Sequence, residues 1–119
     1  MSRLFIILGS LNCLLAVALG AFGAHGLKNI LNPQALQTWD TAVTYHFFHA
    51  LGLLAIAIIQ RDFPRVRASG WLMLVGIIIF SGSLYVLSLT GIKALGMITP
   101  IGGLCFMAAW LWLAVKAKL

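Results

Sequence analysis

The sequence predicts an all-α integral membrane protein, a four-helix bundle that crosses the bilayer up-down-up-down with both termini in the cytoplasm. Of its 119 residues, 62% are hydrophobic and only 8% are charged, whereas soluble domains carry roughly 25% charged residues. Four apolar stretches each reach the length of about twenty residues that a helix needs to cross the ~30 Å hydrocarbon layer. The charged side chains lie between or beside these stretches, as the cost of charge in lipid requires.

The four stretches form a single transmembrane domain, residues 1–119. We place the spans at about residues 4–24, 41–60, 71–90 and 97–115. Because the apolar stretches occupy most of the chain, nearly all of it is expected to lie in the membrane.

Capping residues and breakers predict where the helices begin and end. Asn32 is expected to cap a helix whose first residue is Pro33, so the second helix is expected to start near residue 33, ahead of the membrane. In the short basic loop 61–70, Pro64 is expected to break any helix. Gly91 is expected to end the third helix.

Basic residues are unevenly distributed between the two sides of the predicted bundle. One side holds Arg3, Arg61, Arg65, Arg67, Lys116 and Lys118, and the other holds Lys28 and Lys93. Since cytoplasmic loops retain most Lys and Arg, we expect a multi-pass protein of the cell inner (cytoplasmic) membrane, with loops 25–40 and 91–96 outside. Trp39, Trp71, Trp110 and Trp112 fall near the predicted interfaces, as aromatic belts do.

The net charge of +6 indicates membrane lipids as partners. Basic residues at the ends of apolar segments attract anionic headgroups. They do not form the stripe on a polar domain that is typical of nucleic-acid binding, so no nucleic-acid partner is expected.

Small residues form a stripe on the first span. Its members, Gly9, Asn12, Ala16, Gly20 and Gly23, fall within about an 80° arc of the helix. Such stripes let two membrane helices approach closely, so we interpret this one as a helix-packing seam. The stripe and the small size of one bundle also motivate the hypothesis of a homo-oligomer.

The second span carries polar residues on one face. Tyr45, His46 and His49 share that face, whereas Phe47 lies on the opposite side, so the polar face is expected to look into the bundle. The predicted threading places these residues in the outer half, where they would form an outward-facing pocket. The candidate pocket residues are His25, Tyr45, His46, His49, Ser81, Tyr85, Ser88 and Thr99. The inner half offers little beyond Asn12.

The chemistry of this pocket stays open at the level of sequence. His25, His46 and His49 could bind a divalent metal, because imidazole suits several transition metals. No carboxylate shares their face, however, since Asp40 points about 180° away from His49 on a continuous helix. His46 and His49 share a helix face and cannot sandwich one haem, so a haem would need His25.

The function expected is therefore that of a structural or small-ligand-binding bundle, with no enzymatic activity, because no decisive reaction motif is present. The alternatives are a metal-, lipid- or quinone-binding protein, or a small transporter or proton-handling protein, using His25, His46 and His49. The cofactors stay unknown at this point, and a driven proton relay is poorly supported without a carboxylate in the membrane.

Four short motifs cover nearly the whole chain. They are Gly23-Ala24-His25-Gly26-Leu27, Tyr45-His46-Phe47-Phe48-His49-Ala50-Leu51, Ser81-Gly82-Ser83-Leu84-Tyr85 and Thr99-Pro100-Ile101-Gly102-Gly103. Together they resemble the YgdD-like family of small four-span bacterial inner-membrane proteins, a domain of unknown function. The resemblance implies a four-span membrane protein and no established activity.

Overall fold

The structure, a computed structural model, describes residues 2–117, and all regular secondary structure in that range is helical. Lys118, counted above among the basic residues, lies outside the described residues. The elements are α1 (Ser2–His25), α2 (Pro33–Ile59), η1 (Pro64–Val66), α3 (Arg67–Gly76), η2 (Ile77–Ser81), α4 (Gly82–Thr90), η3 (Lys93–Met97) and α5 (Thr99–Lys116). Because α3, η2 and α4 follow one another without a break, the helices form four rods, each long and apolar enough to cross a membrane. The predicted all-α architecture of four membrane-spanning helices is confirmed.

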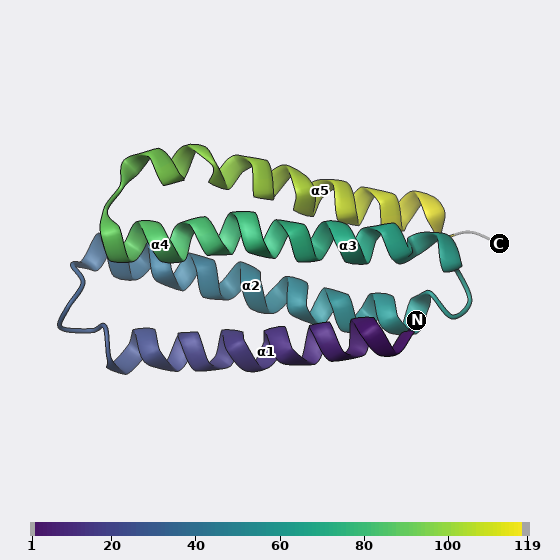
Figure 1. Cartoon of the computed structure of the whole chain (residues 1–119), viewed down its shortest axis with the longest axis horizontal. Coiled ribbons are helices and arrows are strands. Elements are labelled where there is room, and N and C mark those ends of the chain that lie inside the picture. Colours follow the sequence, from purple (N-terminus) through teal and green to yellow (C-terminus); the bar gives the residue numbers. More distant parts are fainter. Residues whose placement is uncertain (1, 118–119) are drawn as a thin grey trace.

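The rods run alternately up and down and form a flat array (Figure 1). The central pair is α2 and the α3–α4 rod, while α1 packs on α2 and α5 packs chiefly on α3. The Cα atoms extend over 51 × 26 × 16 Å, so the array is much thinner than it is long. The start of α1 and the end of α5 share one end of the molecule, which we call the proximal end. The α1–α2 and α4–α5 connections share the opposite, distal end.

The connection between α2 and α3 is shorter than the sequence predicts. Loop 61–70 was expected because of Pro64, but Pro64 starts η1 and α3 already begins at Arg67. The physical reason is that proline at the first helical position loses no hydrogen bond and has the φ angle of a helix. Pro64 therefore initiates the third rod instead of interrupting it.

The small residues of α1 lie against α2. A Cβ atom on Gly23 would approach Trp39 Cδ1 to 2.5 Å, and one on Gly9 would approach Leu54 Cδ2 to 2.9 Å. The Trp39 indole donates a hydrogen bond to the carbonyl oxygen of Leu19 at 2.9 Å, which closes the seam at its distal end. The stripe thus serves as a packing seam between α1 and α2 within the chain.

The third rod contains one π-helical turn, η2, at its closest approach to α5. A Cβ atom on Gly102 would lie 2.4 Å from the backbone nitrogen of Phe80, so the two backbones are in direct contact there. From the end of the same turn, Ser81 Oγ donates to the carbonyl oxygen of Ala42 on α2 at 2.8 Å. Such turns often occur near functional sites, because they change which side chains face a neighbouring helix.

Candidate functional site

His46 joins three helices near the middle of the bundle. Its imidazole is 2% exposed, with Nε2 3.0 Å from Asn12 Oδ1 on α1 and Nδ1 2.9 Å from the Tyr85 hydroxyl on α4. Asn12 Nδ2 donates to the carbonyl oxygen of Leu8 at 2.8 Å, so Oδ1 is the atom that accepts. These partners assign the proton of a neutral His46 to Nε2, and Tyr85 then donates to Nδ1.

His49, one turn further along α2, is held in the opposite tautomer. Nδ1 lies 2.8 Å from the carbonyl oxygen of Tyr45, which can only accept, so Nδ1 carries the proton. The Trp110 indole on α5 donates to Nε2 at 3.0 Å. The Phe106 ring stacks on the imidazole with centroids 3.5 Å apart and planes 9° apart. His49 is therefore a neutral link between α2 and α5.

The structure does not bring the three histidines together. Both nitrogens of His46 and of His49 already have hydrogen-bond partners, which leaves no lone pair for a ligand. His25 is exposed at the end of α1, 13 residues after Asn12 and so about 20 Å away along the helix axis. Within residues 2–117, no three His, Cys, Asp or Glu side chains are grouped so that they could hold a metal ion. The same separation prevents His25 and His46 from flanking one haem.

The two central histidines lie near the middle of α2. His46 is 13 residues, and so about 20 Å along the axis, from the helix start at Pro33. His46 bonds to Asn12, which the sequence assigned to the opposite half. The histidines thus occupy the middle of the bundle, where they bond to neighbouring groups, and neither lines the hollow described below.

Two other predicted pocket residues act as links between helices. Ser81 binds the backbone of α2, as described above. Thr99 Oγ1 at the start of α5 lies 2.6 Å from Ser83 Oγ on α4, and Thr99 also donates to the carbonyl oxygen of Leu95 at 3.2 Å. Tyr45 is 43% exposed and packs its ring against neighbouring aromatic rings. None of these three residues lines one of the cavities described below.

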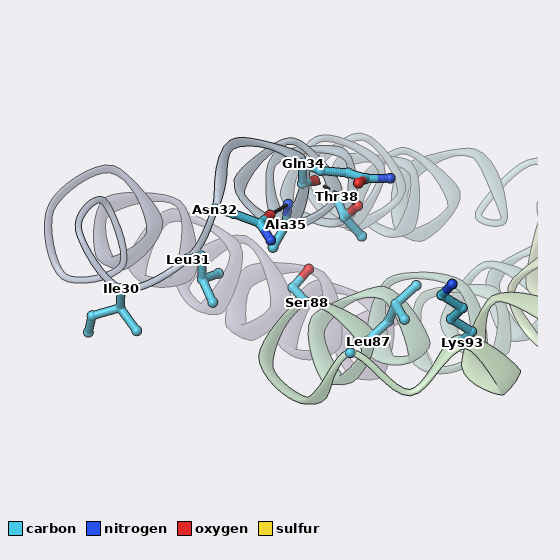
Figure 2. A pocket seen from close by; sticks show the side chains of 10 residues that line it. Ile30, Leu31, Asn32, Gln34, Ala35, Thr38, Leu87, Ser88 and Lys93 are labelled. Atoms are coloured by element: carbon cyan, nitrogen blue, oxygen red, sulfur yellow. Dashed lines mark hydrogen bonds between the residues drawn. The ribbon is translucent and has the colours of Figure 1, made fainter.

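Ser88 is the one predicted pocket residue that lines a hollow. This distal hollow, of about 560 Å³, lies between the start of α2 and the end of α4 (Figure 2). Its lining residues are Ile30, Leu31, Asn32, Gln34, Ala35, Thr38, Leu87, Ser88, Gly91 and Lys93. Figure 2 shows the Ser88 hydroxyl directed toward α2, with Leu87 and Lys93 on the same wall. The chain leading into α2 forms the other wall.

Some polar side chains of the distal hollow already form hydrogen bonds with the backbone. Asn32 Oδ1 accepts from the Ala35 N–H at 2.7 Å, which leaves the Asn32 amide group free to donate. The Thr38 hydroxyl donates to the carbonyl oxygen of Gln34 at 3.1 Å. No acidic residue is among the lining residues, so Lys93 makes the hollow electropositive.

Sequence reasoning missed several of these roles. Trp110 was interpreted as an interface residue, but its indole binds a buried histidine. Lys93 was used only in the count of basic residues, and Gln34 was not identified as a site residue. The reason is that the path of a connection cannot be derived from helical periodicity. Asn12 was placed in the packing seam, where a polar residue can hydrogen-bond to a neighbouring helix, but its partner His46 was not identified.

Comparison with known proteins agrees with this architecture. The family described as "Protein of unknown function (DUF423)" matches residues 19–103. The chain is 51% identical to UPF0382 membrane protein YwdK of Bacillus subtilis over 118 residues, which cover 97% of this chain and 96% of that protein. It is 53% identical to a UPF0382 membrane protein of Staphylococcus saprophyticus, with 95% of each chain covered. No solved structure matches the chain. The chain belongs to the DUF423 family and is an integral membrane protein of unknown function.

Proposed function

We propose that this protein binds a small anionic amphiphile in the distal hollow and acts without catalysing a reaction. The observation that carries the proposal is the hollow itself, because its volume of about 560 Å³ falls within the range of about 300–1,000 Å³ that is common for small-molecule sites. Lys93 supplies the only cationic side chain of its lining and would pair with the anionic group. Ile30, Leu31 and Leu87 supply apolar walls for a short tail.

The proposal includes an orientation, with the proximal end in the cytoplasm and the distal hollow outside. Arg61, Arg65 and Arg67 flank the proximal connection, whereas Lys28 and Lys93 belong to the two distal connections. The excess of basic residues at the proximal end supports this orientation by the positive-inside rule. In this orientation the membrane is the cytoplasmic (inner) membrane, as the resemblance to the YgdD-like proteins also suggests.

The central histidines have a structural role in this proposal. A catalytic base, a metal ligand or a proton carrier needs a free nitrogen or a partner that titrates with it. All four ring nitrogens of His46 and His49 instead bind neutral groups, three of them on α1, α4 and α5 and the fourth on the backbone of α2. Amide, hydroxyl and ammonium groups line the distal hollow, and binding is the chemistry that they support best.

Calorimetric titration tests the proposal with hexyl phosphate as the probe and the full chain in nanodiscs, with empty nanodiscs as the blank. We expect saturable binding that Lys93→Gln weakens about tenfold or more, as for the loss of one charge-assisted hydrogen bond. Arg61→Gln is the matched control, because it removes one exposed basic side chain that does not line this hollow. Absence of saturable binding, or an equal loss in the two variants, would refute the proposal.

A further inference from the structure

A second set of cavities follows the contact between α1 and α2, away from the distal hollow. The upper cavity, of about 290 Å³, is lined by Gly20, Gly23, Ala24, Lys28, Leu36, Trp39, Asp40 and Val43. The lower cavity, of about 530 Å³, is lined by Ala16, Val17, Gly20, Ala21, Val43, Thr44, Phe47 and Phe48. Since both include Gly20 and Val43, they form one continuous groove, which we call the α1–α2 groove.

The upper part of the α1–α2 groove carries one charge of each sign. Lys28 comes from the connection after α1, and Asp40 comes from the third turn of α2. Asp40 is one of only two acidic residues in the chain. Both side chains are exposed and line the same cavity. A ligand group that fits here carries both a negative and a positive charge.

The lower part of the groove is apolar. Val17, Phe47 and Phe48 are exposed along it. The Thr44 hydroxyl donates to the carbonyl oxygen of Asp40 at 2.9 Å, which satisfies the hydroxyl proton within the helix. A surface of this kind fits a hydrocarbon chain, because it offers dispersion contacts and no unpaired donor.

The floor of the groove is rigid. Gly20 brings the helices together, because a Cβ atom there would lie 3.2 Å from Val43 Cγ1. Trp39 is 4% exposed, and its bond to the backbone of α1 fixes its ring. A groove between tightly packed helices loses little conformational entropy when it is filled.

We propose that the α1–α2 groove binds one zwitterionic phospholipid. The lipid phosphate pairs with Lys28, the ammonium group donates to the Asp40 carboxylate, and an acyl chain lies along Phe47 and Phe48. The order of the two parts agrees with the membrane, since the charged part lies toward the distal end and the apolar part toward the bilayer centre. A lipid with a net negative headgroup fits less well, because it places no cation opposite Asp40.

Native mass spectrometry of the full chain tests this proposal with dioleoyl phosphatidylethanolamine and dioleoyl phosphatidylglycerol as probes. We expect the affinity for phosphatidylethanolamine to exceed the affinity for phosphatidylglycerol by a factor of about ten or more, as one charge-assisted hydrogen bond allows. Asp40→Asn removes this preference by weakening the binding of phosphatidylethanolamine, while Lys28→Gln weakens the binding of both lipids. Ala21→Trp blocks the lower cavity from its exposed side and reduces the binding of both lipids.

Arg61→Gln is the control variant, because it removes an exposed basic side chain that lines neither the groove nor the distal hollow, and its lipid affinities should equal those of the wild type. Thermal unfolding of each variant in detergent shows whether it is folded. Equal affinity of the wild type for the two lipids would overturn the proposal. So would unchanged binding of phosphatidylethanolamine to a folded Asp40→Asn or Ala21→Trp variant.

Discussion

Replacing Tyr85 by Phe removes only the hydroxyl group, which forms the hydrogen bond between α4 and His46. In the wild type, the hydroxyl lies 2.9 Å from His46 Nδ1. The ring of Tyr85 also packs against Trp39 with centroids 4.8 Å apart, and Phe preserves that contact. The substitution therefore isolates the hydrogen bond, leaving the Nδ1 acceptor unpaired in a side chain that is 2% exposed.

The expected loss of stability is about 1–2 kcal/mol. A buried acceptor without a partner costs about 1–3 kcal/mol in proteins, and interhelical hydrogen bonds in membrane proteins average about 0.6 and reach about 1.7 kcal/mol. A change of tautomer cannot recover the loss. It would turn the lone pair of Nε2 toward Asn12 Oδ1, which is itself an acceptor because Asn12 Nδ2 is bound to Leu8.

Reversible unfolding of the purified protein in mixed micelles measures this loss. The helical circular dichroism signal is recorded as the fraction of denaturing detergent increases. Tyr45→Phe is the matched control, because Tyr45 is 43% exposed and binds His49 through its backbone carbonyl. The control should change the free energy of unfolding by no more than about 0.5 kcal/mol. Wild-type stability of Tyr85→Phe, or an equal loss in both variants, would refute the reasoning.

Three further outcomes are expected. Trp110→Phe should lower the free energy of unfolding in the same assay by about 1–2 kcal/mol, because it removes the indole donor of the second buried histidine. Gly102→Ala should lower the free energy of unfolding by about 3 kcal/mol or prevent folding, since its Cβ would lie 2.4 Å from a backbone atom of η2. The control Gly103→Ala, whose Cβ has its nearest contact at 3.8 Å, should leave the free energy of unfolding nearly unchanged. In intact cells, a membrane-impermeant maleimide should label Lys93→Cys and should not label Arg65→Cys; the reverse pattern would contradict the proposed orientation.

The rods of the fold could be predicted because hydrophobic length alone determines them. A helix that crosses the hydrocarbon layer needs about twenty apolar residues, and the chain has four such stretches. The ends of the rods were harder to place, because one residue type has opposite effects at different helix positions. Pro33 and Pro64 both start helical turns, although Pro64 was expected to break a helix.

Helical phase, which is the angular position of each residue around the helix axis, also predicted that the central histidines point into the bundle. Phase gives a direction and not a partner, however, so it could not show that His46 binds Asn12 or that His49 binds Trp110. These pairs depend on the relative heights of helices that are distant in sequence. The distal hollow was unpredictable for a different reason, since the α1–α2 connection forms one of its walls and has no hydrophobic period.

The central claim is that the buried histidines are neutral structural links and not ligands. Solid-state NMR of the protein in bilayers, with ¹⁵N-labelled histidine, measures the protonation of each ring nitrogen at neutral pH. The structure predicts two different tautomers, with the proton of His46 on Nε2 and that of His49 on Nδ1, and with no change when zinc is added. Doubly protonated rings, one shared tautomer, or resonances of His46 or His49 that shift with zinc would contradict the account.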